Sequence, residues 1–206
     1  MARGWADVES GNVRLFIALM PPEGVVEHLD DAVQRLRRLR REEGDVRWVP
    51  PQQWHVTLVF LGEVPAESVD ELAPALDDVM THCRRPALQL AGSGTFGSKV
   101  LFADVVEPKH DAPSRLLDEL AARTREVVVR RGIEVEQRPF RPHLTLARAR
   151  GGRAAFADVA KGLENYRGPS WTAERVVLVE SEKATNGRGS GVVHRTLSTA
   201  LVGPTP

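Results

Sequence analysis

The chain has 206 residues, 42% of them hydrophobic, which is enough for one domain or two closely joined lobes with a buried core. Lys and Arg number 28, as do Asp and Glu, so no overall field attracts nucleic acid or membranes, and an anionic ligand needs local groups. The single cysteine, Cys83, excludes an intrachain disulfide and a cysteine-based metal site.

The beginning of the sequence does not resemble a signal peptide. The first dozen residues lack the charged-then-apolar pattern of a signal peptide, and no run approaches the roughly 18 apolar residues that span a bilayer. We therefore expect a cytoplasmic protein with no membrane partner. Its folded domain is expected over 12–206, after a flexible N-terminus at 1–11. No broad apolar stripe predicts assembly, so the expected state is a monomer.

The first half of the chain alternates between strand and helix patterns. Apolar residues recur at three and four in the helical segments, and apolar or β-branched residues form short runs in the extended ones. The expected elements are a strand at 13–19, a helix over 26–36, extended segments at 47–49 and 54–61, a helix over 69–80, and strands at 87–90 and 100–106 around a Gly-rich turn at 92–97. Gly62 is expected to end the second extended segment.

The second half repeats these patterns. We expect a helix over 116–128, with Asp111 and Pro113 as start signals, then strands at 133–137, 143–147, 176–179 and 192–201, and a further helix near 154–163. Strands and helices mix without regular βαβ alternation, and several strands are close enough in sequence to pair as hairpins. The sequence therefore predicts an α+β fold, mostly antiparallel, with two similar halves.

One tetrapeptide, His-x-Thr-Leu, occurs at 55–58 and again at 143–146, almost half the chain length apart. Alternate residues of a β-strand share a face, so within each copy the His and Thr side chains point the same way. Two such strands facing each other would place His55, Thr57, His143 and Thr145 around one small anion.

Two histidines beside a phosphodiester can act as acid and base in one step, because the ordinary pKa of histidine is about 6.5. The threonine hydroxyls could donate to phosphate oxygens as charge accumulates. This scheme requires no metal and no cofactor. Zinc is disfavoured because neither copy is HExxH and no Cys or Asp lies at ligand spacing.

A third copy of the tetrapeptide begins at His194. It lacks the upstream proline of the other two and follows a flexible-looking stretch at 184–191. We interpret His194 as an incidental or ligand-contacting residue rather than as the acid or base.

Arginines gather around the second motif and could neutralise neighbouring phosphates. They are Arg138, Arg141, Arg148, Arg150 and Arg153. Strict strand alternation puts Arg148 on the face opposite His143 unless the strand ends first, so a solvated rim is the alternative. A second basic run, at 35–41, is typical of a solvated helix face.

Several segments resemble the 2H phosphoesterase superfamily, specifically the bacterial and archaeal RNA 2′,3′-cyclic phosphodiesterase branch, also called the 2′-5′ RNA ligase family. The similar pieces are RLFIAL, RWVPPQQWHVTLVFLG, GSGTFGSKVLFADV, FRPHLTLAR and VVLVESEKATNGRGSGVVHRTL. The resemblance covers nearly the whole chain, and the paired motifs with these flanks are its specific signal.

The resemblance implies two pseudo-symmetric lobes, each a mostly antiparallel sheet backed by helices, with one motif per lobe facing a central cleft. It implies metal-independent hydrolysis of an RNA terminal 2′,3′-cyclic phosphate, or of a small cyclic nucleotide, to a 2′-phosphomonoester. His55 would protonate the 3′-oxygen and His143 would activate water. Thr57 and Thr145 would bind the phosphate, and Arg148 would assist.

Two alternatives remain open at this point. A 2′-5′ RNA ligase would join tRNA halves through a 2′-5′ bond, and a noncatalytic protein would only bind RNA or nucleotides. Phe16 and Phe96 match aromatic family positions near the cleft, although both also suit a plain core. His194 stands where the family commonly has an aromatic residue, which affects substrate choice rather than phosphate chemistry.

Overall fold

An antiparallel sheet forms the centre of the computed structural model, which describes residues 11–39, 46–108, 115–149, 156–186 and 189–203. Its strands are β1 (Asn12–Leu19), β2 (Val46–Trp48), β3 (Val56–Pro65), β4 (Ala87–Phe96), β5 (Val100–Val106), β6 (His143–Ala149), β7 (Arg167–Thr172), β8 (Arg175–Asn186) and β9 (Gly189–Leu201). The helices are α1 (Glu23–Leu39), α2 (Ser68–Thr81), α3 (Leu116–Arg130) and α4 (Ala157–Leu163).

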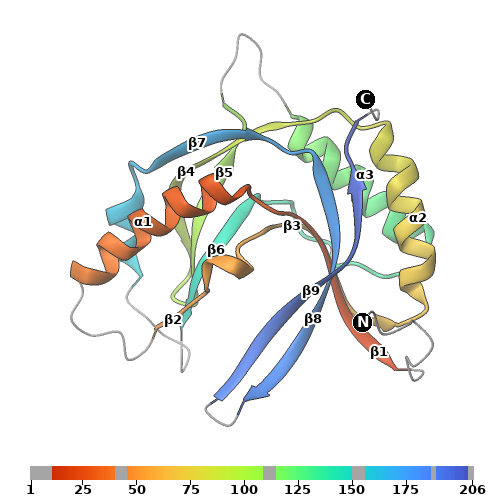
Figure 1. The fold of residues 1–206 in the computed structure, drawn as a ribbon, viewed down its shortest axis with the longest axis horizontal. Coiled ribbons are helices and arrows are strands. Elements are labelled where there is room, and N and C mark those ends of the chain that lie inside the picture. The colour runs from red at the N-terminus through yellow and green to blue at the C-terminus, as the bar shows by residue number, and fades with distance from the viewer. Residues whose placement is uncertain (1–10, 40–45, 109–114, 150–155, 187–188, 204–206) are drawn as a thin grey trace.

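The sheet divides between β6 and β3 into two lobes (Figure 1). The strand order is β7-β4-β5-β6-β3-β1-β8-β9, and β2 pairs with β6 beside this path. The lobes meet where β6 and β3 share a single residue pair, Val56 opposite Leu144. Neither lobe is a continuous half of the chain, because β1 from its beginning pairs with β8 from its end, which places β3, β1, β8 and β9 in one lobe.

A pair of helices covers each lobe (Figure 1). Helices α1 and α4 pack against β7, β4 and β5, and helices α2 and α3 pack against β9 and β3. Their apolar stripes are buried as the spacing predicts: Leu29 and Val33 of α1 are buried, as are Leu72, Leu76 and Met80 of α2. The α+β, mostly antiparallel fold is thus confirmed, with two lobes backed by helices.

The strand predicted at 133–137 is wrong. Residues 133–142 are without helix or strand, and Ile133 and Val135 pack against the core from a loop. The Glu136 carbonyl accepts hydrogen bonds from the Arg138 amide and the Arg125 guanidinium, so it is not available to a sheet. Beyond Val56, β3 has a strand partner on one side only, but the segment at 133–137 forms no strand along the other edge.

Glycines at positive φ also misled the prediction of strand ends. Gly62 (φ 76°) lies inside β3, which continues to Pro65, and Gly92 (φ 77°) lies inside β4, which continues to Phe96. Both are next to register shifts, where an irregular strand needs a residue that tolerates positive φ. The Gly-rich turn is therefore shorter than expected.

Three further differences concern the ends of strands and one missed strand. The strand expected from Trp54 begins at Val56, after a 3₁₀ turn at Pro51–Gln53. The flexible-looking stretch is strand at 184–186 and 189–191, so β8 and β9 form a long hairpin. Strand β7 was not predicted, because its sequence, RGPSWT, contains Gly and Pro and lacks an apolar run.

Some predictions fall on residues that the structure does not describe. These are the flexible N-terminus at 1–10, the start signals Asp111 and Pro113, Arg150 and Arg153, and the beginning of the helix expected from 154. The domain boundaries, 12–206, stay a prediction. Across the described ranges, no helix is long and apolar enough to cross a membrane.

Candidate active site

The two motif histidines lie where the lobes meet. His55 directly precedes β3, and His143 is the first residue of β6. The residues that follow them, Val56 and Leu144, are the pair that joins the two strands. Both of these apolar residues are fully buried, so each histidine is anchored to the core at its neighbouring residue.

The two imidazoles make the same local hydrogen bond. His55 Nδ1 lies 2.7 Å from the carbonyl oxygen of Gln53, and His143 Nδ1 lies 2.7 Å from that of Arg141. A carbonyl can only accept, so Nδ1 carries the proton in both rings. Among the described residues neither Nε2 has a hydrogen-bond partner, which leaves both Nε2 atoms able to exchange a proton with a ligand.

Each motif also contains a β-bulge at its leucine. Between β1 and β3, Ile17 pairs with Val59 and Ala18 with Thr57, so Leu58 is the extra residue. Between β5 and β6, Leu101 pairs with Ala147 and Phe102 with Thr145, so Leu146 is the extra residue.

The second bulge changes the face on which Arg148 lies. An extra residue reverses the alternation beyond it, so Arg148 shares a face with His143 and Thr145. Leu146 and Ala147 are accordingly both buried in succession. The expectation that strict alternation puts Arg148 on the opposite face is therefore wrong.

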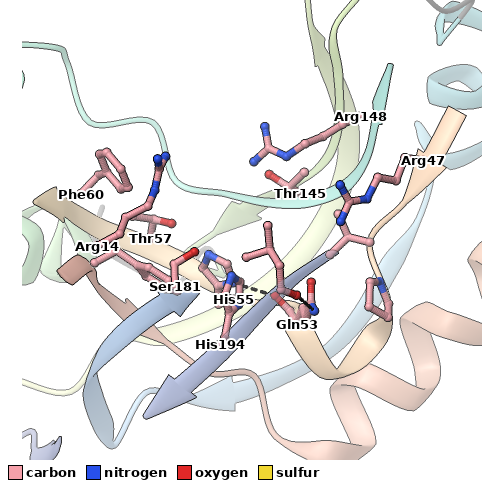
Figure 2. Close-up of a pocket in the computed structure, with 14 residues that line it drawn as sticks. Arg14, Arg47, Gln53, His55, Thr57, Phe60, Thr145, Arg148, Ser181 and His194 are labelled. Carbon is pink, nitrogen blue, oxygen red and sulfur yellow. Dashed lines mark hydrogen bonds between the residues drawn. The ribbon is translucent and has the colours of Figure 1, made fainter. Parts of the chain in front are cut away.

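A cavity of about 430 Å³ lies over this junction (Figure 2). Four of the predicted site residues line it: His55, Thr57, Thr145 and Arg148. The fifth, His143, lines an adjoining cavity of about 580 Å³. Thr57 and Phe60 line both cavities, so the two open spaces are neighbours.

Sequence reasoning missed several residues of the first cavity. These are Arg14, Arg47, Gln53, Phe60 and Ser181. The sequence does contain an indication for Phe60, which follows His55 by five residues, the same spacing by which Arg148 follows His143. The equivalent bulges bring both residues to the cavity.

Burial lowers the pKa of both motif histidines. The pKa of His55 falls to about 4, first through burial and then through the charges of His194, Arg148 and His143, against the opposing hydrogen bond to Gln53. Burial is also the main cause that lowers the pKa of His143, and nearby Arg141 and Arg148 add to it. Both rings are therefore neutral in the free protein near pH 7.

Both aromatic positions named by the resemblance contact a motif histidine. Phe16 is only 4% exposed and stacks on His55 with ring centroids 4.6 Å apart. Phe96 is 36% exposed and meets His143 edge-on at 4.9 Å. A third ring, Phe102, lies 5.4 Å from His143 and was not predicted to be near the site.

His194 belongs to the same cavity as His55. It lies on β9, and its ring centroid is 5.2 Å from that of His55 and 5.0 Å from that of Phe16. The hairpin that carries it is tied to the motif, because Gln53 Nε2 donates to the carbonyl of Val192 at 2.5 Å. This placement agrees with a ligand-contacting residue more than with an incidental one.

Comparison with known proteins decides the family. A model of the 2′-5′ RNA ligase superfamily matches residues 25–185. The chain belongs to the 2′-5′ RNA ligase superfamily. An RNA 2′,3′-cyclic phosphodiesterase of Thermus thermophilus is 32% identical over 182 residues, 85% of each protein. One from Bacillus subtilis is 30% identical over 145 residues, which are 68% of this chain and 74% of the relative.

Solved structures share the fold of this superfamily member. TT0787 of Thermus thermophilus has a TM-score of 0.69 and 27% identity, over 92% of this chain and 97% of its own. E. coli LigT complexed with 3′-AMP has a TM-score of 0.65 and 25% identity, over 93% and 98%. The resemblance inferred from the paired motifs is thus confirmed.

No cluster of three or more His, Cys, Asp or Glu side chains within the described residues could hold a metal ion. The first cavity offers the imidazoles of His55 and His194, hydroxyls and guanidinium groups, a set suited to a phosphate, and His143 lines the adjoining cavity.

Proposed function

We propose that the protein hydrolyses the 2′,3′-cyclic phosphate at an RNA end to a 2′-phosphomonoester, with His55 and His143 as the acid and base. The observation that carries this proposal is the matched pair of Nδ1 hydrogen bonds, which leaves two Nε2 atoms available at the junction of the lobes. The names of the relatives, RNA 2′,3′-cyclic phosphodiesterases, support the substrate class.

The reaction requires two proton transfers, one from water to a base and one from an acid to the leaving 3′-oxygen. His143 takes a proton from water, and the water oxygen attacks phosphorus. His55 gives its proton to the 3′-oxygen as the bond from phosphorus to that oxygen breaks, which leaves the phosphate on the 2′-oxygen. Thr57 and Thr145 donate hydrogen bonds to the non-bridging oxygens, where negative charge accumulates, and Arg148 adds a positive charge.

The acid role of His55 depends on the substrate. In the free protein the pKa of His55 is about 4, which opposes protonation. A phosphate anion bound beside the ring favours the protonated form, so substrate binding raises this pKa. With a 5′-hydroxyl in place of water as the nucleophile, the same proton transfers would open the cyclic phosphate and form a 2′-5′ bond, and the name of the matching superfamily supports ligation as the second candidate.

An oligoribonucleotide ending in a 2′,3′-cyclic phosphate tests the proposal. It is incubated with the protein in EDTA, with and without a second RNA that has a 5′-hydroxyl, and products are compared with 2′- and 3′-phosphate standards. We expect the 2′-phosphate at a rate that EDTA does not change. A joined RNA would support ligation, and binding without turnover would favour the noncatalytic alternative. Dependence on added metal would contradict the mechanism.

A further inference from the structure

The cavity holds more positive charge than one cyclic phosphate would require. Arg14, Arg47 and Arg148 line it, and none of its lining residues is acidic. A cyclic phosphodiester carries a single negative charge. The surplus indicates that a ligand filling this cavity brings a second anionic group.

Two of these arginines form a pair. Arg47 of β2 lies directly opposite Arg148 of β6, so their side chains share a face of the sheet. Like charges in that position repel each other, and besides burial the charge of Arg47 lowers the pKa of Arg148. Neither guanidinium has an ion pair among the described residues. An anion between the two would remove the repulsion.

Arg14 differs from this pair. Its guanidinium lies 4.0 Å from a Glu63 carboxylate oxygen and 4.9 Å from the centroid of the Phe60 ring. Figure 2 places Arg14 and Phe60 at one end of the cavity and Arg47 and Arg148 at the other. Within the described residues, the cavity arginines without an acidic partner therefore lie at the end beside Thr145.

The backbone holds Arg47 in place. Strand β2 has only three residues and pairs with β6, and the next amide, that of Val49, donates to the Leu146 carbonyl at 2.8 Å. The Trp54 indole in turn donates to the Val49 carbonyl at 3.0 Å. This fixed backbone keeps Arg47 beside Arg148 before a ligand binds, so binding of a phosphate has only the side chain left to order.

We propose that Arg47 binds a second phosphate of the substrate, the phosphodiester on the 5′ side of the cyclic end, and that Arg148, between Arg47 and Thr145, contacts both phosphates, so that the protein prefers oligonucleotide ends to nucleoside cyclic monophosphates. Three residues of extended strand span roughly 10 Å, and the bulge at Leu146 shortens the path from Thr145 to Arg148. The long side chain of Arg148 can reach back over this distance to a phosphate next to the one that Thr145 holds. This inference rests on the proposed function.

The test compares two substrates that share the reacting end: a nucleoside 2′,3′-cyclic monophosphate and a trinucleotide ending in the same group. In Arg47→Ala we expect kcat/KM on the trinucleotide to fall at least about tenfold more than on the monophosphate, mainly through KM. The fall of log(kcat/KM) for the trinucleotide with log salt should become shallower by about 0.7, because one phosphate contact is lost.

Arg123→Ala is the matched control, because Arg123 is an exposed arginine on α3 outside the cavity and should change neither substrate. Equal losses on both substrates in Arg47→Ala would overturn the inference. If the parent protein hydrolyses neither substrate, the proposed function fails separately. In that case the affinity for the trinucleotide tests whether the arginine pair binds a second phosphate. Binding at least about tenfold weaker in Arg47→Ala supports this inference, and unchanged binding contradicts it.

Discussion

Leu58 and Leu146 are equivalent residues in two different strands, since each ends a His-x-Thr-Leu motif and each is the extra residue of a β-bulge. The bulges bring the residue two positions further on to the cavity, which is Phe60 in one lobe and Arg148 in the other. The backbone is thus nearly symmetric while the side chains are not. At these equivalent positions one end of the cavity has an aromatic ring and the other has a guanidinium group, so the two ends can bind different parts of a substrate.

Replacing either motif threonine with valine should slow turnover while the fold is retained. Thr57→Val and Thr145→Val keep the shape of the side chain but remove a hydrogen-bond donor to the phosphate, so kcat should fall by about 10²-fold in each. Thr57→Ser and Thr145→Ser keep the hydroxyl and should retain most activity. Steady-state kinetics on the cyclic-ended RNA measure this, and valine variants as fast as the serine variants would rule out the assigned role.

The pH dependence of kcat/KM should reflect the two lowered histidine pKa values. Catalysis needs one ring protonated and the other neutral, and kcat/KM reports the free enzyme. Both pKa values lie below 6.5, mainly because of burial, so rising pH removes the proton of the acid. We expect the maximum below pH 6.5, with kcat/KM falling through the neutral range. A profile that still rises from pH 6.5 to 8 would contradict these pKa directions.

His194 should influence this profile. When protonated it lowers the pKa of His55, whose ring centroid is 5.2 Å away. The other charges that lower this pKa are those of Arg148 and His143, which stay in place. His194→Gln should therefore move the kcat/KM maximum to higher pH by less than about one unit. His82→Gln, at the exposed end of α2, is the control and should leave the maximum unchanged.

Much of the fold could be predicted because its elements bury one regular stripe. Helix α1 buries Leu29 and Val33, and the strand at its N-terminal side is a plain apolar run, so periodicity identified both. Strand β7 lacks such a run, and the apolar residues at 133–137 pack from a loop instead. Local pattern does not reveal whether an apolar segment pairs with a strand.

The candidate site also contains some residues that a local sequence pattern predicts and others that it does not. His55, Thr57, His143 and Thr145 could be found from the repeated motif alone, because alternation relates residues two apart. The position of Arg148 depends on a bulge, which alternation cannot predict. Arg47 reaches the cavity through the pairing of β2 with β6, a contact between residues distant in sequence.

The junction between the lobes should be sensitive to packing. Leu144 is fully buried and pairs with Val56, so Leu144→Ala should lower the free energy of unfolding by about 2–5 kcal/mol. Val129 of α3 is 51% exposed, and Val129→Ala should change it by less than about 0.5 kcal/mol. Urea unfolding measures both. A loss below about 1 kcal/mol for Leu144→Ala would show that the junction repacks freely.

The central claim is that His55 and His143 act on one phosphate without a metal. Its most direct test is kcat/KM for an RNA ending in a 2′,3′-cyclic phosphate, measured in EDTA for the parent, His55→Ala and His143→Ala. We predict turnover by the parent and a loss of at least about 10²-fold in each variant, because each removes one proton transfer. Full activity in either variant, or a parent inactive in EDTA and restored by metal, would contradict the account.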